Sequence, residues 1–480
     1  MKRLGQILIA VLLLCPILSA CTYQPLGVEK AHSFEVQGDI ETPLTVNKML
    51  DYPTQRVTKD DKNYTAIALE DVIEAAMPRS EEYDLLLIGE DGLSAKISGN
   101  DLSDCYISYS SEYDWEMITE NHPISSQVKN LRTIEVITKD FDSDPETIGI
   151  EDQNGYRCTS AGNLYLEGYT EKRVFEGQSE VNGQAVTVYT THQVIRPQDL
   201  LTFDREIAVF GKDGSICLDK VSEESYFEIT ATGFSYMASD QTVIADVVGV
   251  LSDPPLFSIT DVASDTAYQL EKGNDVLVIE LDGLGWKMFN AAKDNNMLPY
   301  MSTLPVQQVL AVYPPISPVS LAAMLTGETP EVNGIHDRET MDFEGEDIFA
   351  KALQMGKSVA YIEGDTKMLN TSVEPILSIN EGLQDSNVFK NTQAAIAENK
   401  QFIFTHFHSI DDDATSYGPY AQETYDQILA VDEMVKTLVD SFNGTIIITA
   451  DHGLHETQTG GTHGRICSED MLVPYIIISK

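Results

Sequence analysis

The stretch "TIIITADHGLHE" (residues 445–456) joins an apolar run to two side chains that bind metals well. Residues 445–450 are β-branched or apolar, which predicts a buried strand. Asp451 and His452 follow this run directly, and Gly453 comes next. In an open α/β sheet, ligands bind beyond the carboxyl ends of the strands. We therefore expect Asp451 and His452 to lie at a functional site.

The sequence on both sides of this stretch alternates between strand-like and helix-like segments. Four further apolar runs have the length of strands, at residues 275–281, 358–363, 402–407 and 473–479. Three segments with helical character lie between them, at residues 346–356, 387–399 and 422–442. Strands that alternate with helices favour a mostly parallel sheet with helices on both faces. We therefore predict an α/β domain over residues 270–480.

Other candidate ligands stand near the ends of the predicted strands. Asp282 follows the run at 275–281, and Asp411 comes shortly after the run at 402–407. His463 lies in the small-residue segment "GGTHG", and Ser317 begins a helix-like segment. Each has a simpler explanation: a turn for Asp282, a helix cap for Ser317, a surface position for His463. Together, the carboxylates and imidazoles predict a site for Zn²⁺ or a similar divalent ion.

The predicted site has the chemistry for phosphoryl transfer. A serine hydroxyl beside a metal ion is an activated nucleophile, and a helix start is a good place for a phosphate. Two divalent ions about 4 Å apart can stabilise both the entering and the leaving oxygen of an in-line displacement.

Five motifs occur in an order that resembles a known enzyme superfamily. They are "VIELDGLGW", "YPPISPVSLAAMLTGETPEVNGIH", "SIDDDATSYGP", "ITADHG" and "GGTHG". The combination resembles the alkaline phosphatase superfamily, most closely its type I phosphodiesterase/nucleotide pyrophosphatase family, over about residues 275–480. The resemblance implies two divalent ions, with Zn²⁺ as the expected metal. It places Asp282, Ser317, Asp451 and His452 around one ion, and Asp411 and His463 around the other. Ser317 stands at the position of the nucleophile, which is usually threonine in that branch.

Two positions depart from the pattern of this branch. Thr415 stands where the family has a histidine ligand. The second site then binds its metal more weakly, holds a different ion, takes a substitute ligand such as His408, Asp412 or Asp413, or is empty. Arg338 lies near the position of a phosphate-contacting asparagine. An arginine fork binds phosphate well, and the alternative for Arg338 is a solvated loop position. The sulfatase branch is disfavoured because "SPVSLA" does not match its processed motif.

The region before the α/β domain has a different pattern. Short alternating runs at residues 83–98 and 206–221 are broken by Asp-Gly turns, which predicts β-hairpins. The two runs resemble each other, so we predict a β-rich α+β region with a duplicated module, at 36–150 and 151–255. A proline-containing polar stretch at 251–274 marks the boundary to the α/β domain.

The first residues have the pattern of an export signal. A basic start is followed by an apolar run at residues 7–18, too short to span a bilayer, which predicts a signal peptide over 1–20. "LSAC" (18–21) resembles the bacterial lipobox, which implies that Cys21 carries a lipid and that 21–35 form a tether. We therefore expect a lipoprotein anchored on the extracytoplasmic face of a membrane. An ordinary secretory signal is the alternative.

The net charge limits the possible partners, and the spacing of the cysteines limits their possible roles. The formal net charge is −45, which argues against a nucleic-acid-binding surface and means that an anionic substrate needs local positive charge. None of the cysteines after Cys21 forms a CxxC pair, so we expect them to be structural or unpaired: Cys105, Cys158, Cys217 and Cys467.

These observations predict an extracytoplasmic, lipid-anchored, metal-dependent hydrolase that acts on a small-molecule or envelope phosphate ester. The prediction covers both phosphodiesterase and phosphatase activity, with Ser317 as the nucleophile. Two alternatives stay open: a catalytically degenerate surface binding protein, which Thr415 favours, and a phospho-group transferase.

Overall fold

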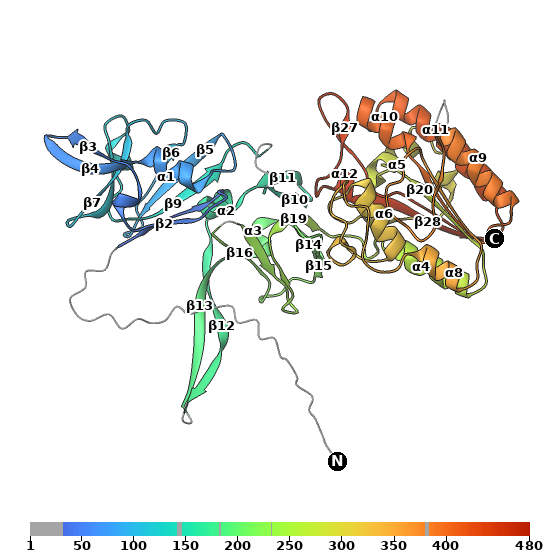
Figure 1. The fold of residues 1–480 in the computed structure, drawn as a ribbon, viewed down its shortest axis with the longest axis horizontal. Helices are drawn as coiled ribbons and strands as arrows, with labels where there is room; N and C mark the ends of the chain where they lie inside the picture. The colour runs from blue at the N-terminus through green and yellow to red at the C-terminus, as the bar shows by residue number, and fades with distance from the viewer. Residues whose placement is uncertain (1–31, 142–145, 182–183, 232, 380–383) are drawn as a thin grey trace, which may run out of the picture.

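The computed structural model describes residues 32–480 except 142–145, 182–183, 232 and 380–383. The predicted signal peptide, Cys21 and most of the predicted tether lie outside the described residues. Figure 1 shows β-rich structure in the N-terminal half and a layered α/β domain at the C-terminus. In the part of the chain that is described, no helix has the length and apolar content needed to cross a membrane.

Two sheets enclose the core of the first β-rich module. One has five strands in the order β2-β1-β9-β5-β6, and the other has four in the order β3-β4-β7-β8. The bounds of the first are β1 (Phe34–Gly38), β2 (Leu44–Val46), β5 (Tyr83–Gly89), β6 (Ser94–Ser98) and β9 (Leu131–Thr138). Those of the second are β3 (Thr54–Lys59), β4 (Lys62–Ala68), β7 (Cys105–Ser110) and β8 (Asp114–Thr119). Helix α1 (Leu69–Ala76) contributes four buried residues to this module.

The second β-rich module has a five-stranded sheet like the first, and its other sheet has five strands instead of four. Its sheets have the orders β11-β10-β19-β14-β15 and β12-β13-β16-β17-β18. The bounds of the first are β10 (Ile148–Asp152), β11 (Gly155–Thr159), β14 (Ile207–Gly211), β15 (Ile216–Asp219) and β19 (Val247–Ser252). Those of the second are β12 (Thr170–Val181), β13 (Gln184–Ile195), β16 (Tyr226–Ile229), β17 (Phe234–Met237) and β18 (Val243–Ile244). Short helices α2 (Ala161–Glu167) and α3 (Pro197–Leu200) complete the module.

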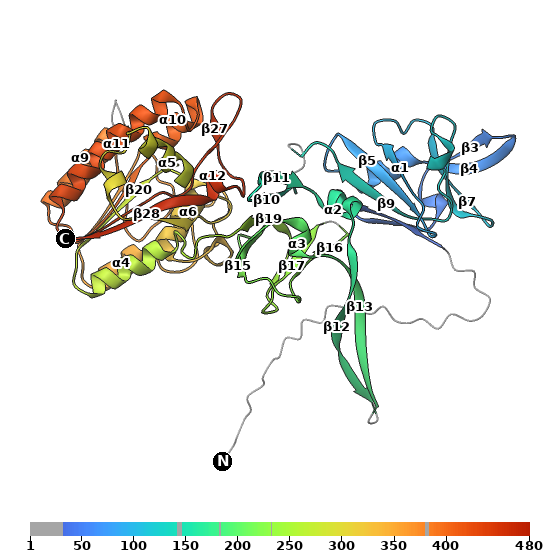
Figure 2. The ribbon, with the colours of Figure 1, turned by 180° about the vertical axis from the view of Figure 1, so that it is seen from behind.

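The strand pairings of the two modules correspond. Strand β1 runs parallel to β9 as β10 does to β19, and β5 runs antiparallel to β9 as β14 does to β19. We propose that the modules are copies of one unit, with the boundaries stated above. The long β12–β13 hairpin, which projects from the second module in Figures 1 and 2, is an elaboration of that unit.

The C-terminal domain is built on a seven-stranded sheet in the order β21-β28-β25-β20-β24-β22-β23. Its strands are β20 (Val276–Leu281), β21 (Val306–Leu310), β22 (Val359–Glu363), β23 (Ile376–Leu377), β24 (Phe402–Phe407), β25 (Thr445–Thr449) and β28 (Leu472–Ser479). Five of the strands run parallel to one another. At one edge, β28 pairs antiparallel with β25, and β21 pairs antiparallel with β28. The strands are apolar because both faces of the sheet are covered. The predicted fold class is therefore confirmed.

Two groups of helices cover this sheet. Helices α4 (Asp261–Glu271), α6 (Ser317–Thr326) and α8 (Ile348–Gln354) contact one another. Helix α11 (Gln422–Ser441) contacts both α9 (Gln384–Ala397) and α10 (Ser409–Tyr417). Figures 1 and 2 show the two groups on opposite sides of the sheet. Helix α5 (Trp286–Asp294) packs near β28, and α7 (Pro330–Asn333), α12 (Ser468–Met471) and the β26–β27 pair (His455–Glu456 and Gly461–Thr462) lie in connecting segments.

The second β-rich module packs against the α/β domain through a small apolar cluster. Phe210 and Leu251 from the module contact a cluster that includes Ile466 and Met471 of the domain. Ser468 also donates a hydrogen bond to the buried carboxylate of Glu151. These contacts hold the segment that follows the "GGTHG" motif.

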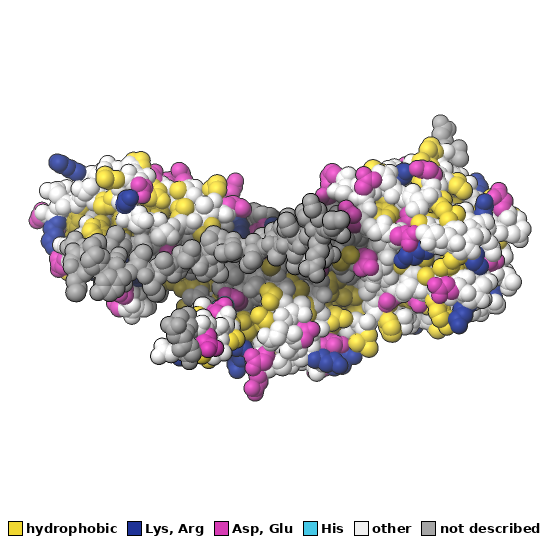
Figure 3. Space-filling view, turned by 60° about the horizontal axis from the view of Figure 1, so that its bottom comes forward, with side chains coloured by type: hydrophobic (Ala, Val, Ile, Leu, Met, Phe, Trp, Pro, Cys, Tyr) yellow, Lys and Arg dark blue, Asp and Glu magenta, His cyan; other side chains and the backbone are white. Residues whose placement is uncertain are grey.

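The four cysteines of the described region form no disulfide, in line with the expectation that they are structural or unpaired. On the face drawn in Figure 3, the described Lys and Arg side chains are interspersed with Asp and Glu.

Candidate metal centre

The sheet brings the predicted site residues to the carboxyl ends of its central strands. Asp282 follows β20, and Asp451 and His452 follow the neighbouring strand β25. Ser317 is the first residue of α6. All four residues are buried, with exposed fractions between 0% and 3%. The structure therefore gathers the four residues that the family resemblance places around one metal ion.

The four side chains converge at nearly equal distances. Oγ of Ser317 lies 3.5 Å from Oδ1 of Asp282 and 3.3 Å from Nε2 of His452. The same nitrogen lies 3.5 Å from Oδ1 of Asp282 and 3.2 Å from Oδ2 of Asp451. Zinc bonds of about 2.0–2.1 Å in a tetrahedral site place ligand atoms about 3.3 Å apart. The spacing is therefore that of ligands around a shared ion.

The hydrogen bonds around these residues leave the inward-facing atoms free for a cation. Oδ1 of Asp451 accepts hydrogen bonds from the backbone N–H groups of Gly283 and His452, whereas the buried Oδ2 has no hydrogen-bond partner and faces Nε2 of His452. Nδ1 of His452 lies 3.1 Å from the carbonyl oxygen of Gly453. A proton on Nδ1 donated to that oxygen leaves Nε2 as the lone-pair donor, an arrangement typical of metal-bound histidine. These residues fit a divalent ion.

Ser317 does not cap its helix, so that simpler explanation is wrong. The N-cap residue of α6 is Ile316, and Ser317 occupies the first helical position, followed by Pro318. No cap hydrogen bond forms, and the Ser317 hydroxyl points toward Asp282 and His452 instead. Because the positive end of the α6 dipole lies at this position, an anion bound beside Ser317 would be stabilised.

Gly283 allows β20 to end close to helix α10. Its φ is +76°, and a Cβ atom there would lie 3.0 Å from Cα of Asp411 and 2.7 Å from Cδ1 of Leu454. A turn does form here, since Leu284 N–H donates to the carbonyl of Leu281. The Asp282 carboxylate nevertheless faces the metal-centre residues, so the turn explanation does not account for it.

The residues predicted for the second ion form a looser group. Oδ1 of Asp411 lies 3.9 Å from Nε2 of His463, and the imidazole of His463 stacks on that of His452 with ring centroids 4.0 Å apart. Nδ1 of His463 lies 2.9 Å from the carbonyl oxygen of Pro315. Arg338 donates a hydrogen bond to Nε2 of His463 at 3.1 Å. Both ring nitrogens of His463 are therefore engaged by protein groups.

Burial shifts the protonation of this second group. Burial, together with the neighbouring His452 and Arg338, lowers the pKa of His463 to about 3, so its imidazole is neutral. Burial and the nearby Asp282 raise the pKa of Asp411 to about 7. Thr415 is exposed on α10. Arg338 lies at the rim of the site, beside His463.

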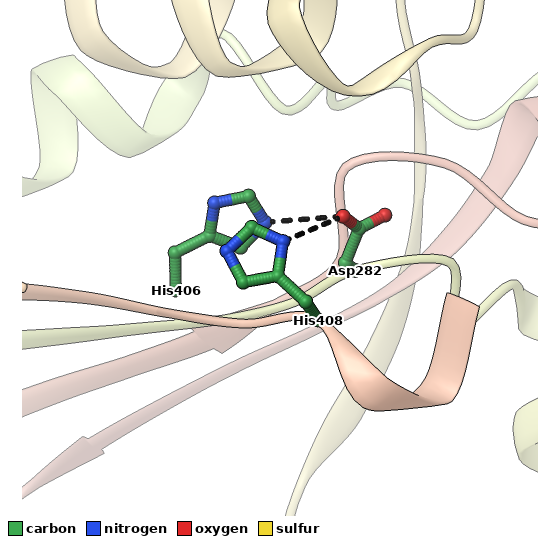
Figure 4. Close-up of side chains that lie close together, drawn as sticks. All are labelled: Asp282, His406 and His408. Atoms are coloured by element: carbon green, nitrogen blue, oxygen red, sulfur yellow. Dashed lines mark ion pairs between the residues drawn. The ribbon is translucent and has the colours of Figure 1, made fainter. Parts of the chain in front are cut away.

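The sequence reasoning missed a buried set of ionisable residues beneath this centre. Glu280, Glu363 and His406 lie within β20, β22 and β24, and each is 0% exposed. In the sequence, each could have been found as an ionisable residue within an apolar strand-like run, as in "VLVIEL", "SVAYIE" and "FIFTHF". His408, which was a candidate substitute for the missing ligand at 415, contacts Asp282 instead (Figure 4).

A family model described as "Metalloenzyme superfamily" matches residues 244–480. The C-terminal half of the chain belongs to the Metalloenzyme superfamily. This confirms the predicted membership of the alkaline phosphatase superfamily. The narrower resemblance to the phosphodiesterase/nucleotide pyrophosphatase branch stays a prediction.

Individual proteins match shorter parts of the chain. GPI ethanolamine phosphate transferase 1 from Yarrowia lipolytica (strain CLIB 122 / E 150) is 32% identical over 94 residues, which cover 18% of this chain and 10% of that protein. The chain therefore aligns with about a tenth of the length of this curated relative.

Two solved structures show distant similarity. Phosphonoacetate hydrolase from Sinorhizobium meliloti 1021, in complex with phosphonoformate, is 15% identical, with a TM-score of 0.32, over 38% of this chain and 57% of that chain. Murine ectonucleotide pyrophosphatase/phosphodiesterase 5, an inactive variant in complex with AMP, is 19% identical, with a TM-score of 0.30, over 38% of this chain and 58% of that chain.

Proposed function

We propose that this member of the Metalloenzyme superfamily is a metal-dependent hydrolase of phosphate esters with Ser317 as its nucleophile. The observation that carries the proposal is the position of the Ser317 hydroxyl. It lies buried at the start of α6, 3.3–3.5 Å from a histidine nitrogen and a carboxylate oxygen that have the spacing of metal ligands. A structural serine has no need of such neighbours, whereas a nucleophile does.

The reaction follows from the positions of these groups. A divalent ion bound by Asp282, Asp451 and His452 would promote ionisation of the Ser317 hydroxyl and offset negative charge on the phosphoryl oxygens. Oγ of Ser317 attacks phosphorus in line with the ester oxygen, the P–O bond to the leaving group breaks, and the leaving group departs with its electron pair. Water then attacks the phosphoseryl phosphorus and releases Ser317.

Arg338 is our candidate for binding the substrate phosphate. In the structure its guanidinium uses one N–H on His463, at the rim of the centre. A guanidinium has five N–H donors in a planar fork, so the remaining donors are available to a phosphate oxygen. A chain of net charge −45 repels an anionic substrate. The fixed positive charge of Arg338 would attract that substrate locally.

The cellular location is part of the proposal and depends on the N-terminal sequence. A basic start, a short apolar run and "LSAC" support export and attachment of a lipid to Cys21. The substrate would then be a phosphate ester outside the cytoplasm, either a small molecule or an envelope component.

Transfer of a phospho-group to an acceptor other than water is the second candidate. The match of 94 residues to a GPI ethanolamine phosphate transferase favours it. The two reactions share the attack by Ser317 and differ in what attacks the phosphoseryl group. Product analysis with and without an added alcohol acceptor separates free phosphate from a new ester.

Metal removal and return tests the proposed function. Purified full-length protein is assayed on p-nitrophenyl phosphate and bis-p-nitrophenyl phosphate before treatment with EDTA, after treatment, and after Zn²⁺ is restored. We expect hydrolysis of at least one ester that disappears on chelation and returns with the metal. Absence of hydrolysis with the metal bound would instead favour the degenerate, ligand-binding alternative.

A further inference from the structure

Three neighbouring strands of the sheet carry a row of ionisable side chains. Glu280 on β20 pairs with His406 on β24. Glu363 on β22 comes one residue after the Ile362–Thr405 pair, which places it beside His406 as well. In register across parallel strands, such residues point to the same face of the sheet. All three side chains are fully buried.

Two more residues extend the row toward the metal centre. Asp282 and His408 come two residues after Glu280 and His406, so they lie on the same side of the chain. Figure 4 shows both imidazoles turned toward the Asp282 carboxylate. Oδ2 of Asp282 lies 3.4 Å from Nε2 of His406 and 3.3 Å from Nδ1 of His408. These distances again match the separation of about 3.3 Å between ligands of a tetrahedral zinc ion.

The hydrogen bond of His408 determines which of its nitrogens faces Asp282 with a lone pair. Nε2 of His408 lies 2.7 Å from Oε1 of Glu363, in hydrogen-bonding geometry. Because an ionised carboxylate can only accept, Nε2 carries the proton of this bond. In a neutral imidazole, Nδ1 then presents a lone pair to Oδ2 of Asp282. In that tautomer, the 3.3 Å between Nδ1 and Oδ2 is the separation of two ligands around a divalent ion.

Among the described ion pairs, Glu280 has His406 as its one partner. Both of its carboxylate oxygens are buried without a hydrogen-bond partner, and Oε1 lies 3.6 Å from Nε2 of His406. Within the described part of the chain, the ion pairs of Glu280, Asp282 and Glu363 are all with histidines. Burying carboxylates without compensation is costly. A divalent cation would provide that compensation.

We propose that Asp282, His406 and His408, with Glu280 as a fourth ligand, bind a divalent cation of the Zn²⁺ class. The two imidazole ligands favour such ions over Mg²⁺ or Ca²⁺. Glu363 then has the role of the outer carboxylate that orients a metal-bound histidine. The inference deepens the proposed function. It rests on that function in one respect, because Asp282 would bind the ion beside Ser317 through one carboxylate oxygen and this second ion through the other.

This site differs from the second site that the sequence predicted at Asp411 and His463. There, Arg338 already donates to Nε2 of His463, and Thr415 is exposed on its helix. Both groups present three ligand atoms within 4.8 Å of one another, but Asp282, His406 and His408 are all buried, whereas Asp411 and His463 are only half-buried. The second ion would therefore lie on the opposite side of Asp282 from Ser317.

Counting bound ions tests the inference without using activity. The full chain is dialysed against Zn²⁺ and its metal content is measured for wild type, His406→Gln and His408→Gln. We expect each variant to lose about one ion per chain relative to wild type. His336→Gln, which removes an exposed histidine, is the control and should retain the wild-type content. A folded His408→Gln protein with as many ions as wild type would overturn the proposal.

Asp411→Asn keeps the test decisive if the histidine variants do not fold. The inferred site does not use Asp411, so this variant should hold at least two ions. A fall from two ions to one in Asp411→Asn would assign the second ion to Asp411 and overturn the inference.

The inference and the proposed function fail separately. Protein that binds the His408-dependent ion but hydrolyses no phosphate ester contradicts only the function. Protein that hydrolyses esters, while His408→Gln keeps every ion, contradicts only the second site.

Discussion

Oγ of Ser317 lies 3.3 Å from Nε2 of His452, although the two residues are 135 positions apart in the chain. One stands at the start of a helix and the other just beyond the end of a strand. Their meeting point is lined by carboxylates that have no lysine or arginine partner among the described ion pairs.

Removal of metal should destabilise the folded chain. A ligand that binds only the native state stabilises it, by about 2.7 kcal/mol at a free concentration of 100 times Kd. Without the ion, the buried carboxylates of Asp282 and Asp451 face each other across the centre, which adds repulsion. We expect excess EDTA to lower the free energy of unfolding by about 3 kcal/mol, measured by urea denaturation with and without added Zn²⁺.

Asp451→Asn provides the matched control for that experiment. The amide keeps the size of the carboxylate but removes the charge of the unpartnered Oδ2 atom. The variant should bind metal more weakly, and its stability should depend less on EDTA than that of wild type. Equal sensitivity to EDTA in both proteins would contradict a metal ligand at position 451.

Arg338→Ala should weaken catalysis while leaving the fold intact. Arg338 is exposed at the rim, and a hydrogen bond from a charged group contributes about 1.5–3 kcal/mol. We expect kcat/KM on phosphate esters to fall about 10- to 100-fold, measured by steady-state kinetics. Arg338→Lys retains the positive charge but not the planar fork of donors, so its kcat/KM should lie between those of wild type and Arg338→Ala. If Arg338→Ala matches wild type, Arg338 is only a solvated loop residue.

Gly283→Ala should be strongly destabilising. The added methyl group would press on the backbone of Asp411 and on Leu454 while the residue keeps a φ of +76°. Gly273 is the matched control because it has a φ of +88° and no atom within 4 Å of a built Cβ. Gly273→Ala should therefore cost about 1 kcal/mol, and Gly283→Ala about 2 kcal/mol more. Equal losses in urea denaturation would contradict the close approach of β20 to α10.

Glu135 should make the stability of the first module depend on pH. Burial raises the pKa of this carboxyl to about 8, although Gln37 donates a hydrogen bond to it. Between the ordinary glutamate pKa of about 4.3 and a pKa of about 8, the native state binds more protons than the unfolded state. The free energy of unfolding therefore falls as pH rises through that window.

Glu135→Gln should remove this dependence. An amide resembles the protonated carboxyl and does not ionise, so the variant should become more stable relative to wild type by on the order of 3 kcal/mol between pH 5 and 8. Denaturation at several pH values measures the difference, with Glu35→Gln on the exposed side of the neighbouring strand as control. A constant difference between Glu135→Gln and wild type across that range would show that Glu135 does not titrate there.

The α/β domain and its main centre were predictable because the signals are local. Long apolar runs predict parallel strands, and the acids that follow them must meet at one edge of the sheet. Asp282, Asp451 and His452 are found there for that reason. The position of Ser317 in its helix was less predictable, since a serine before a proline commonly caps a helix.

The second group of ligands could not be read from the sequence in the same way. Glu280, His406 and Glu363 are each an isolated ionisable residue within an apolar strand. Only the register of the three strands shows that they are neighbours. Because Thr415 stands where the family has a histidine ligand, a substitute ligand was one expectation, and His408 was among the candidates. That His408 faces Asp282, and not Asp411, depends on strand alternation and on the direction of the chain after β24.

The most direct test of the central claim is kcat/KM for Ser317→Ala compared with Ser320→Ala. Ser320 is an equally buried serine on the same helix, and its hydroxyl has no hydrogen-bond partner. With Zn²⁺ bound, Ser317→Ala should lose about 10³-fold or more in kcat/KM on p-nitrophenyl esters, because no other group replaces the nucleophile. Ser320→Ala should stay near the wild-type value. Chelator-sensitive hydrolysis that persists at the wild-type rate in folded Ser317→Ala would contradict the account.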